Sequence, residues 1–240
     1  MNADALIIAE QLDQERLIKG PRSMLHGIPL VVKDNIFTKD SMRTTANSYV
    51  LKSFYASYDA HIIKRLRDAG AIILAKANCS EWAYFMSMDK MPSGYGSMFG
   101  QVRHPYDSRI DPYGSSTGSA VAVASNLAVA SIGTETNGSL MSPAQQNSVV
   151  SIKPTLGLVS RHGIIPISRH QDTAGPMSRT VEDSAILLDT IRGYDDEDIT
   201  TSRIPTTIGS FYEALHDKPK AKRIGFLEFE NYPNDQEEVK

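Results

Sequence analysis

Gly27-Ile-Pro-Leu-Val-Val-Lys33 is a short apolar run that follows a glycine and closes on a lysine. No other charge lies within it, and β-branched residues are frequent, which favours a strand buried on both faces of a sheet. Lys33 either shares this burial or extends its charged end past the strand to water. The difference matters for chemistry, because burial disfavours the ammonium form and lowers the pKa of a lysine.

Helical and strand patterns alternate along the rest of the chain. Residues 2–18 and 59–69 carry apolar side chains at helical spacing, whereas residues 71–75 and 128–132 are short apolar runs typical of strands. Thr180-Val-Glu-Asp183 has the pattern of a capping box, which predicts that another helix begins there. The alternation predicts an α/β protein with one extended sheet.

Two turns rich in glycine, serine and threonine follow Lys33, at residues 114–118 and 133–139. A serine hydroxyl is a weak nucleophile at neutral pH, and a lysine with a lowered pKa can take its proton. The second turn can direct successive backbone N–H groups into one concavity, as an oxyanion hole requires. Residues 116–126 predict a tightly packed helix that begins near the first turn. These features suggest a serine hydrolase with a lysine base, although either turn alone is also an ordinary loop.

Two other serine patterns compete with this interpretation. Gly114-Ser-Ser-Thr-Gly118 fits the nucleophile elbow of α/β-hydrolases, with Asp172 and His216 following in the required order. An elbow needs a strand directly before it, whereas residues 105–113 contain two prolines and polar turn residues. Ser87-Met-Asp-Lys90 fits a β-lactamase motif, but the partner motifs of that family are absent from the sequence.

Four segments, taken together, resemble the amidase signature family of serine hydrolases in both order and spacing. They are Gly27-Ile-Pro-Leu-Val-Val-Lys-Asp-Asn-Ile36, Asp111-Pro-Tyr-Gly-Ser-Ser-Thr-Gly-Ser-Ala120, Gly133-Thr-Glu-Thr-Asn-Gly-Ser139 and Ile152-Lys-Pro-Thr155. Residues 77–82, 157–166 and 171–176 look most like the peptide-amidase-type branch. They look less like the related glutaminase component of glutamyl-tRNA(Gln) amidotransferase.

The resemblance implies a fold and a domain organisation. The expected fold is an α/β/α sandwich around a mixed β-sheet, in which residues 1–240 form one amidase signature domain. Full-length relatives in the family are longer at both ends, so we expect this chain to be truncated at both ends, with its last strand near residues 223–227. A truncated sheet exposes edges and apolar faces, which favours a complementary chain or a homo-oligomer as partner.

The resemblance also implies a mechanism. Ser139 is the expected nucleophile, Lys33 the base, and Ser115, next to a cis peptide, relays the proton between them. The backbone N–H groups of Thr136, Asn137, Gly138 and Ser139 match the oxyanion hole of the family. The expected reaction is hydrolysis of a linear carboxamide, for which a peptide C-terminal amide is one candidate, with release of ammonia or an amine.

No cofactor and no metal are implied by the resemblance. The expected substrate is a small-molecule or peptide amide. The alternative is a catalytically inactive fragment, or one half of a two-chain amidase or amidotransferase.

Three departures from the family pattern bear on the site. Asn137 interrupts the usual pair of glycines before the nucleophile, and Met141 stands where an arginine is usual. Met141 is expected to fill the space of that arginine with apolar bulk. Glycines are usual near Ser148 and Ser151, where a serine side chain is expected to crowd the backbone.

Composition is that of an ordinary globular enzyme. Of the 240 residues 41% are hydrophobic and 22% are charged, and the net charge is −3, which argues against disorder and against a nucleic-acid partner attracted by charge. The single cysteine, Cys79, excludes an intrachain disulfide and suits a reducing compartment, so we expect a cytoplasmic protein. Neither a signal peptide nor a membrane span is expected. The acidic segment 194–198 is expected to be a solvated loop.

Overall fold

The core of the molecule is a five-stranded mixed sheet. The computed structural model describes residues 1–87, 91–205, 207–217, 223 and 225. The strand expected near residues 223–227 therefore falls largely outside the described residues. The strands run in the order β2-β1-β5-β7-β6, with β1 parallel to both β2 and β5, and β7 antiparallel to both β5 and β6. Their bounds are Pro29–Lys33 for β1, Ile72–Ala77 for β2, Ala130–Glu135 for β5, Val150–Ser151 for β6 and Thr173–Ser178 for β7.

Strand β1 is the buried strand that the apolar run predicts. Leu30 and Val32 are fully buried, and Val32 lies opposite Ile132 of β5. Because β1, β2 and β5 are parallel, their carboxyl ends meet at one edge of the sheet, where α/β proteins commonly place their sites. Lys33 and Glu135 close β1 and β5 at this edge.

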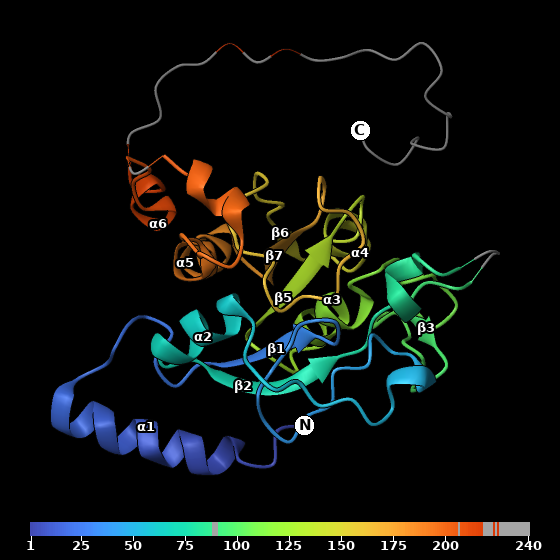
Figure 1. Cartoon of the computed structure of the whole chain (residues 1–240), viewed down its shortest axis with the longest axis horizontal. Helices are drawn as coiled ribbons and strands as arrows, with labels where there is room; N and C mark the ends of the chain where they lie inside the picture. Colours follow the sequence, from blue (N-terminus) through green and yellow to red (C-terminus); the bar gives the residue numbers. More distant parts are fainter. Residues whose placement is uncertain (88–90, 206, 218–222, 224, 226–240) are drawn as a thin grey trace.

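Helices cover both faces of the sheet, so the expected three-layer α/β/α architecture is confirmed (Figure 1). Helices α2 and α5 pack against the face that carries Leu30 and Val32, where they form the main hydrophobic core. Helices α1 and α3 contribute to the clusters on the other face. The helices are α1 (Ala5–Lys19), α2 (His61–Asp68), α3 (Thr117–Ala124), α4 (Met141–Gln146), α5 (Val181–Ile191) and α6 (Phe211–Ala214).

Shorter elements complete the described chain. Three 3₁₀ helices occur, η1 (Tyr49–Leu51), η2 (Glu81–Tyr84) and η3 (Ile199–Arg203), and strands β3 (Tyr95–Gly96) and β4 (Gly100–Gln101) form a small hairpin. Within the described residues, no helix combines the length and the apolar character needed to cross a bilayer.

The predicted start of helix α5 is confirmed. The hydroxyl of Thr180 accepts a hydrogen bond from the backbone N–H of Asp183 at 3.0 Å, which satisfies one of the free donors at the helix N-terminus. The second glycine-rich segment differs from the prediction, because residues 133–135 belong to β5 and only residues 136–140 form a turn. Pairing with β7 extends the strand, since Gly133 lies opposite Gly175 and Glu135 opposite Thr173.

Candidate active site

Lys33 is completely buried, so the alternative in which its charge extends to water is wrong. Its Nζ donates hydrogen bonds to the Oγ atoms of Ser115 at 2.8 Å and Ser116 at 3.0 Å, and to the carbonyl of Thr134 at 3.1 Å. Burial lowers the pKa of Lys33 to about 8, although the charge of Glu135 acts in the opposite direction. A substantial fraction of this amine is therefore neutral near physiological pH.

The first serine turn holds Ser115 against the lysine. The peptide bond between Gly114 and Ser115 is cis, as the resemblance implies. The backbone N–H of Ser116 donates to the carbonyl of Ser139 at 3.1 Å, so the two serine segments lie side by side. Helix α3 follows directly at Thr117, and its N-terminus lies near the site as predicted.

The hydroxyl of Ser116 is both a donor and an acceptor of hydrogen bonds with strand β5. Its Oγ donates to the carbonyl of Thr134 at 2.9 Å and accepts from the N–H of Thr134 at 3.2 Å. A Cβ atom on Gly133 would lie 2.8 Å from the Ser116 Oγ, too close for any side chain. Gly133 is therefore required by the close approach of the serine turn to β5.

Ser139 lies on the loop between β5 and α4 and is buried. Within the described part of the chain, the backbone N–H groups of Thr136, Asn137 and Ser139 donate to no protein acceptor, so they are free for a bound ligand. The N–H of Gly138 faces the carboxylate of Glu135 instead. The predicted oxyanion hole thus has three unengaged donors of its four.

Glu135 organises this loop, and the sequence reasoning missed it. Its buried carboxylate accepts from the N–H groups of Leu140 at 2.6 Å and Met141 at 3.1 Å, and forms an ion pair with Lys153 at 3.1 Å. Burial acts to raise the pKa of Glu135, but these hydrogen bonds and Lys153 outweigh burial and lower it. The available signal was a charged residue at the end of a buried strand, the same signal that identified Lys33.

Met141 does not fill a buried space, so that expectation is wrong. It is the first residue of α4, and 46% of its surface is exposed. The wall next to the loop that carries Ser139 is instead held by Glu135 and Lys153. Of the two serines that stand near usual glycine positions, Ser148 adopts a left-handed φ of +57°, whereas Ser151 fits into β6 and donates to the carbonyl of Pro176 at 2.9 Å.

A second buried lysine, Lys76 near the end of β2, was also missed. Burial lowers the pKa of Lys76 to about 8. Its Nζ donates to the hydroxyl of Thr44 at 2.8 Å and to the carbonyl of Ile36. No serine hydroxyl of the described residues is hydrogen-bonded to it, so Lys76 connects β2 to residues 36–44 rather than facing a nucleophile.

The residues that the nucleophile-elbow alternative requires do not lie together. The carboxylate of Asp172 accepts from the hydroxyl of Thr136 at 2.6 Å and from two backbone N–H groups, and the ring of His216 contacts Tyr212. Ser116 bonds to Lys33, not to a histidine. In the β-lactamase pattern, Lys90 lies outside the described residues.

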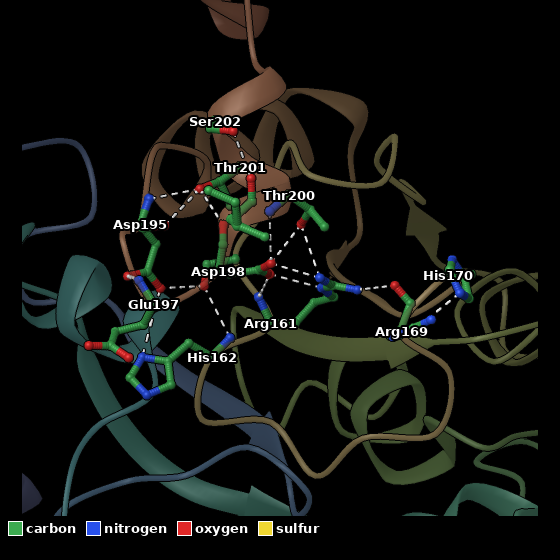
Figure 2. Close-up of polar contacts among 12 residues, drawn as sticks. Arg161, His162, Arg169, His170, Asp195, Glu197, Asp198, Thr200, Thr201 and Ser202 are labelled. Atoms are coloured by element: carbon green, nitrogen blue, oxygen red, sulfur yellow. Dashed lines mark hydrogen bonds and ion pairs between the residues drawn. The ribbon is translucent and has the colours of Figure 1, made fainter.

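A cavity of about 220 Å³ adjoins the loop that carries Ser139, called the nucleophile loop below after the role proposed for that serine (residues 136–140). It reaches Thr134 and Thr136 at one end, and residues 164–167 give it an apolar wall. Arg161 and Asp198 line it at the other end, joined by hydrogen bonds of 2.7 and 2.8 Å (Figure 2). A pocket of this kind suits the organic body of a small substrate.

The acidic segment 194–198 is not the solvated loop that was expected. Asp195 and Asp198 are buried, whereas Tyr194, Asp196 and Glu197 are exposed. Asp195 accepts from the hydroxyl of Ser160 at 2.5 Å, and Asp198 is paired with Arg161. The cause is tertiary, because partners some 35 residues away satisfy each buried carboxylate. In the described residues, no group of three or more His, Cys, Asp or Glu side chains is placed to hold a metal ion.

Comparisons with known proteins identify the family of this chain. The model of the family described as Amidase matches residues 1–240. A probable amidase of Arabidopsis thaliana is 47% identical over 231 residues, which are 94% of this chain and 45% of the plant protein. The chain belongs to the amidase signature family.

Solved structures place the chain near the peptide amidases of this family. The native peptide amidase of Stenotrophomonas maltophilia is 50% identical and superposes with a TM-score of 0.86, covering 90% of this chain and 44% of that one. A glutamyl-tRNA(Gln) amidotransferase component of Halorhodospira halophila is 42% identical over 88% of this chain and 42% of its own length. The predicted branch is thereby confirmed. The chain spans less than half the length of these relatives.

Proposed function

We propose that this chain hydrolyses a linear carboxamide through an acyl-enzyme on Ser139, with Ser115 and Lys33 as its proton relay. The observation that carries the proposal is the fully buried Lys33 amine 2.8 Å from the Ser115 hydroxyl, beside the cis peptide. A neutral buried lysine is a base that can act on a serine hydroxyl near pH 8. Membership of the amidase family supports amide hydrolysis as the reaction class.

The proton path follows the order of the three groups. Lys33 takes the proton of Ser115 as Ser115 takes that of Ser139, whose Oγ attacks the amide carbon. The N–H groups of the loop, Thr136 and Asn137 among them, stabilise the negative oxygen of the tetrahedral intermediate. Ser115 then donates its proton to the departing nitrogen, which leaves as ammonia or an amine, and Lys33 returns its proton to Ser115, so that the lysine is neutral again. Water releases the acyl group by the same relay, and a carboxylate is formed.

The substrate class follows from likeness alone. The similarity to the peptide amidase of Stenotrophomonas maltophilia favours a peptide C-terminal amide. The apolar wall of the 220 Å³ cavity is compatible with an apolar acyl group. Ammonia release from N-blocked dipeptide amides, compared with release from small carboxamides that lack a peptide such as acetamide, tests this choice.

Intact-mass spectrometry after incubation with a fluorophosphonate tests the mechanism, because this probe phosphonylates an activated serine. The chain should gain one adduct, Ser139→Ala should gain none, and Ser115→Ala and Lys33→Ala should react at least about 100-fold more slowly. Ser116→Ala is the matched control for the elbow alternative and should still be labelled at Ser139. Circular dichroism verifies that each variant is folded.

Labelling that persists in Ser139→Ala would contradict the proposal. A folded chain that is never labelled would favour the alternative, in which this chain is an inactive fragment or one half of a two-chain amidase or amidotransferase. Adding a polypeptide that spans the remainder of a related amidase then separates these two cases, because only a half enzyme regains labelling.

A further inference from the structure

A second cavity, of about 450 Å³, lies between helices α2 and α5 and the segment that contains η3. It shares no lining residue with the cavity near the nucleophile loop. Arg65 of α2 and Arg192 at the end of α5 both line it. Two guanidinium groups that converge on one cavity form a centre of positive charge.

The positive charges of the two arginines are unequally neutralised by carboxylates. Arg192 forms an ion pair with Asp189 at 3.1 Å. Arg65 donates its Nε–H to the carbonyl of Thr190 at 2.7 Å, but within the described residues its terminal nitrogens make no hydrogen bond and no carboxylate lies within ion-pair distance. Counting Asp189 with the two arginines, the cavity lining carries one excess positive charge.

Asp189 is not free to compensate Arg65 as well. Its carboxylate accepts from the hydroxyl of Ser210 at 2.7 Å and from the N–H groups of Phe211 at 3.0 Å and Tyr212 at 2.9 Å. Arg65 is half-buried, and burial lowers its pKa, with the charge of Arg192 acting in the same direction and that of Asp68 against it. A guanidinium in this setting favours an anionic partner.

Apolar side chains also line the cavity beside Arg192, whose guanidinium donates a hydrogen bond to the carbonyl of Ile208 at 3.2 Å. Ile204 and Ile208 are half-buried at its lining, and Ser202 stands exposed beside them. Thr201, which precedes Ser202, donates to the carbonyl of Asp198 at 2.8 Å, and Figure 2 shows Asp198 between Thr201 and Arg161. The Arg161–Asp198 pair lines the first cavity and not this one.

We propose that this second cavity binds a small organic monocarboxylate, with the carboxylate on Arg65 and the apolar body against Ile204 and Ile208. The planar guanidinium matches a carboxylate with two parallel N–H···O bonds. One excess positive charge suits a monoanion, whereas a phosphate dianion would also meet the charge of Asp189. This binding is independent of amide hydrolysis.

Isothermal titration of the chain with cyclohexanecarboxylate, at constant ionic strength, tests the proposal. Cyclohexylmethanol is the neutral probe of the same shape, and inorganic phosphate is the alternative anion. Cyclohexanecarboxylate should bind with one-site saturation, and both other probes should bind at least about tenfold more weakly, because a charge-assisted bidentate contact is lost or mismatched. Equal binding of cyclohexylmethanol, tighter binding of phosphate, or no binding of the carboxylate would overturn the assignment.

Variants locate the site. Arg65→Gln should weaken cyclohexanecarboxylate at least about tenfold, whereas Lys64→Gln, its exposed neighbour on α2, should leave the affinity unchanged. Ser202→Glu places a carboxylate at the exposed rim and should compete with the ligand without lowering the melting temperature. If both Arg65→Gln and Ser202→Glu bind cyclohexanecarboxylate with undiminished affinity, the ligand binds elsewhere, for example at the nucleophile loop, and the proposal is wrong.

Discussion

Lys33 combines full burial with hydrogen bonds to neutral hydroxyl groups. Burial alone would make its ammonium form costly, and the Oγ atoms of Ser115 and Ser116 give the amine partners in either protonation state. Burial raises the pKa of the neighbouring Cys79 thiol to about 12, so this thiol stays neutral beside Lys33. Of this lysine and this thiol, Lys33 is therefore the group that titrates near physiological pH.

We expect the rate at which a fluorophosphonate labels Ser139 to rise with pH and level off, with an apparent pKa near 8. The reason is that Lys33 accepts a proton only in its neutral form, which is about a tenth of the population at pH 7. Labelling rates measured from pH 6 to 10 give the profile. Lys33→Met should lose the reaction, and the exposed Lys64→Met should keep the full profile.

Lys76 needs a separate control because its pKa is also lowered to about 8. If Lys33 is the base, the rising limb should survive in folded Lys76→Met, even at a reduced rate. Disappearance of the limb in that variant alone would assign the titration to Lys76.

Among the elements of the fold, strand β5 ends in one carboxylate that fixes the conformation of the nucleophile loop. Glu135 binds the first backbone N–H groups of α4 and thereby fixes the path of the chain on both sides of Ser139. Lys153, which follows β6, neutralises the charge. The loop geometry is thus maintained jointly by two strands.

We expect Glu135→Gln to slow the labelling of Ser139 about tenfold or more and to destabilise the fold by about 1.5–3 kcal/mol, because charged hydrogen bonds to buried N–H groups are lost. The pKa of Glu135 is lowered in the folded state, so its contribution to stability is complete above about pH 4.5 and is lost as pH falls through the lower folded value. Melting curves from pH 7 to pH 3 should show a smaller loss for Glu135→Gln than for the parent chain. An identical pH dependence would contradict this role.

The turn between α4 and β6 offers a paired test of backbone strain. Ser148 is exposed at φ +57°, which costs an L-residue more than a glycine. Ser148→Gly should therefore raise stability by about 0.5 kcal/mol, or the melting temperature by about 1–2 °C. Ser151→Gly in strand β6 should instead lower stability by about 1 kcal/mol, since the strand loses a side chain and a hydrogen bond. Calorimetry that shows the same sign for both variants would refute the argument.

Across the whole molecule, ion pairs differ in burial and in how far apart their partners lie in the sequence. Arg161 and Asp198 are 37 residues apart and join the cavity wall to the segment that leads into η3. Their side chains are 17% and 6% exposed. Arg109 and Asp107 form an equally short pair, but the arginine is 88% exposed.

Double-mutant cycles should distinguish these two pairs. The cycle Arg161→Met with Asp198→Asn should give a coupling energy of about 1–3 kcal/mol in urea unfolding, because both partners are largely removed from water. The cycle Arg109→Met with Asp107→Asn should give no measurable coupling, since water and salt screen the exposed pair. Equal coupling in both cycles would show that the Arg161–Asp198 pair does not hold the cavity wall.

Local sequence patterns were sufficient to predict several features of this protein. The apolar run to Lys33 predicted a buried strand, and Thr180 predicted the start of α5, because each signal lies within a few adjacent residues. The order of the motifs predicted the family and the three-layer fold, which the comparisons and the sheet confirm. The proposed roles of Ser115 and Ser139 stay predictions.

Local sequence patterns predicted strands β1 and β2, the first part of β5, the start of α5 and the family, whereas only the folded chain showed which groups are neighbours. Lys33 meets Ser115 across 82 residues, and only the burial of both shows that the lysine is not extended to water. Residues 133–135, predicted as part of a turn, form a strand because they pair with β7. Asp198, predicted to lie in a solvated loop, is buried because it pairs with Arg161. The physical reason is that burial and pairing depend on partners distant in sequence, which local spacing does not specify.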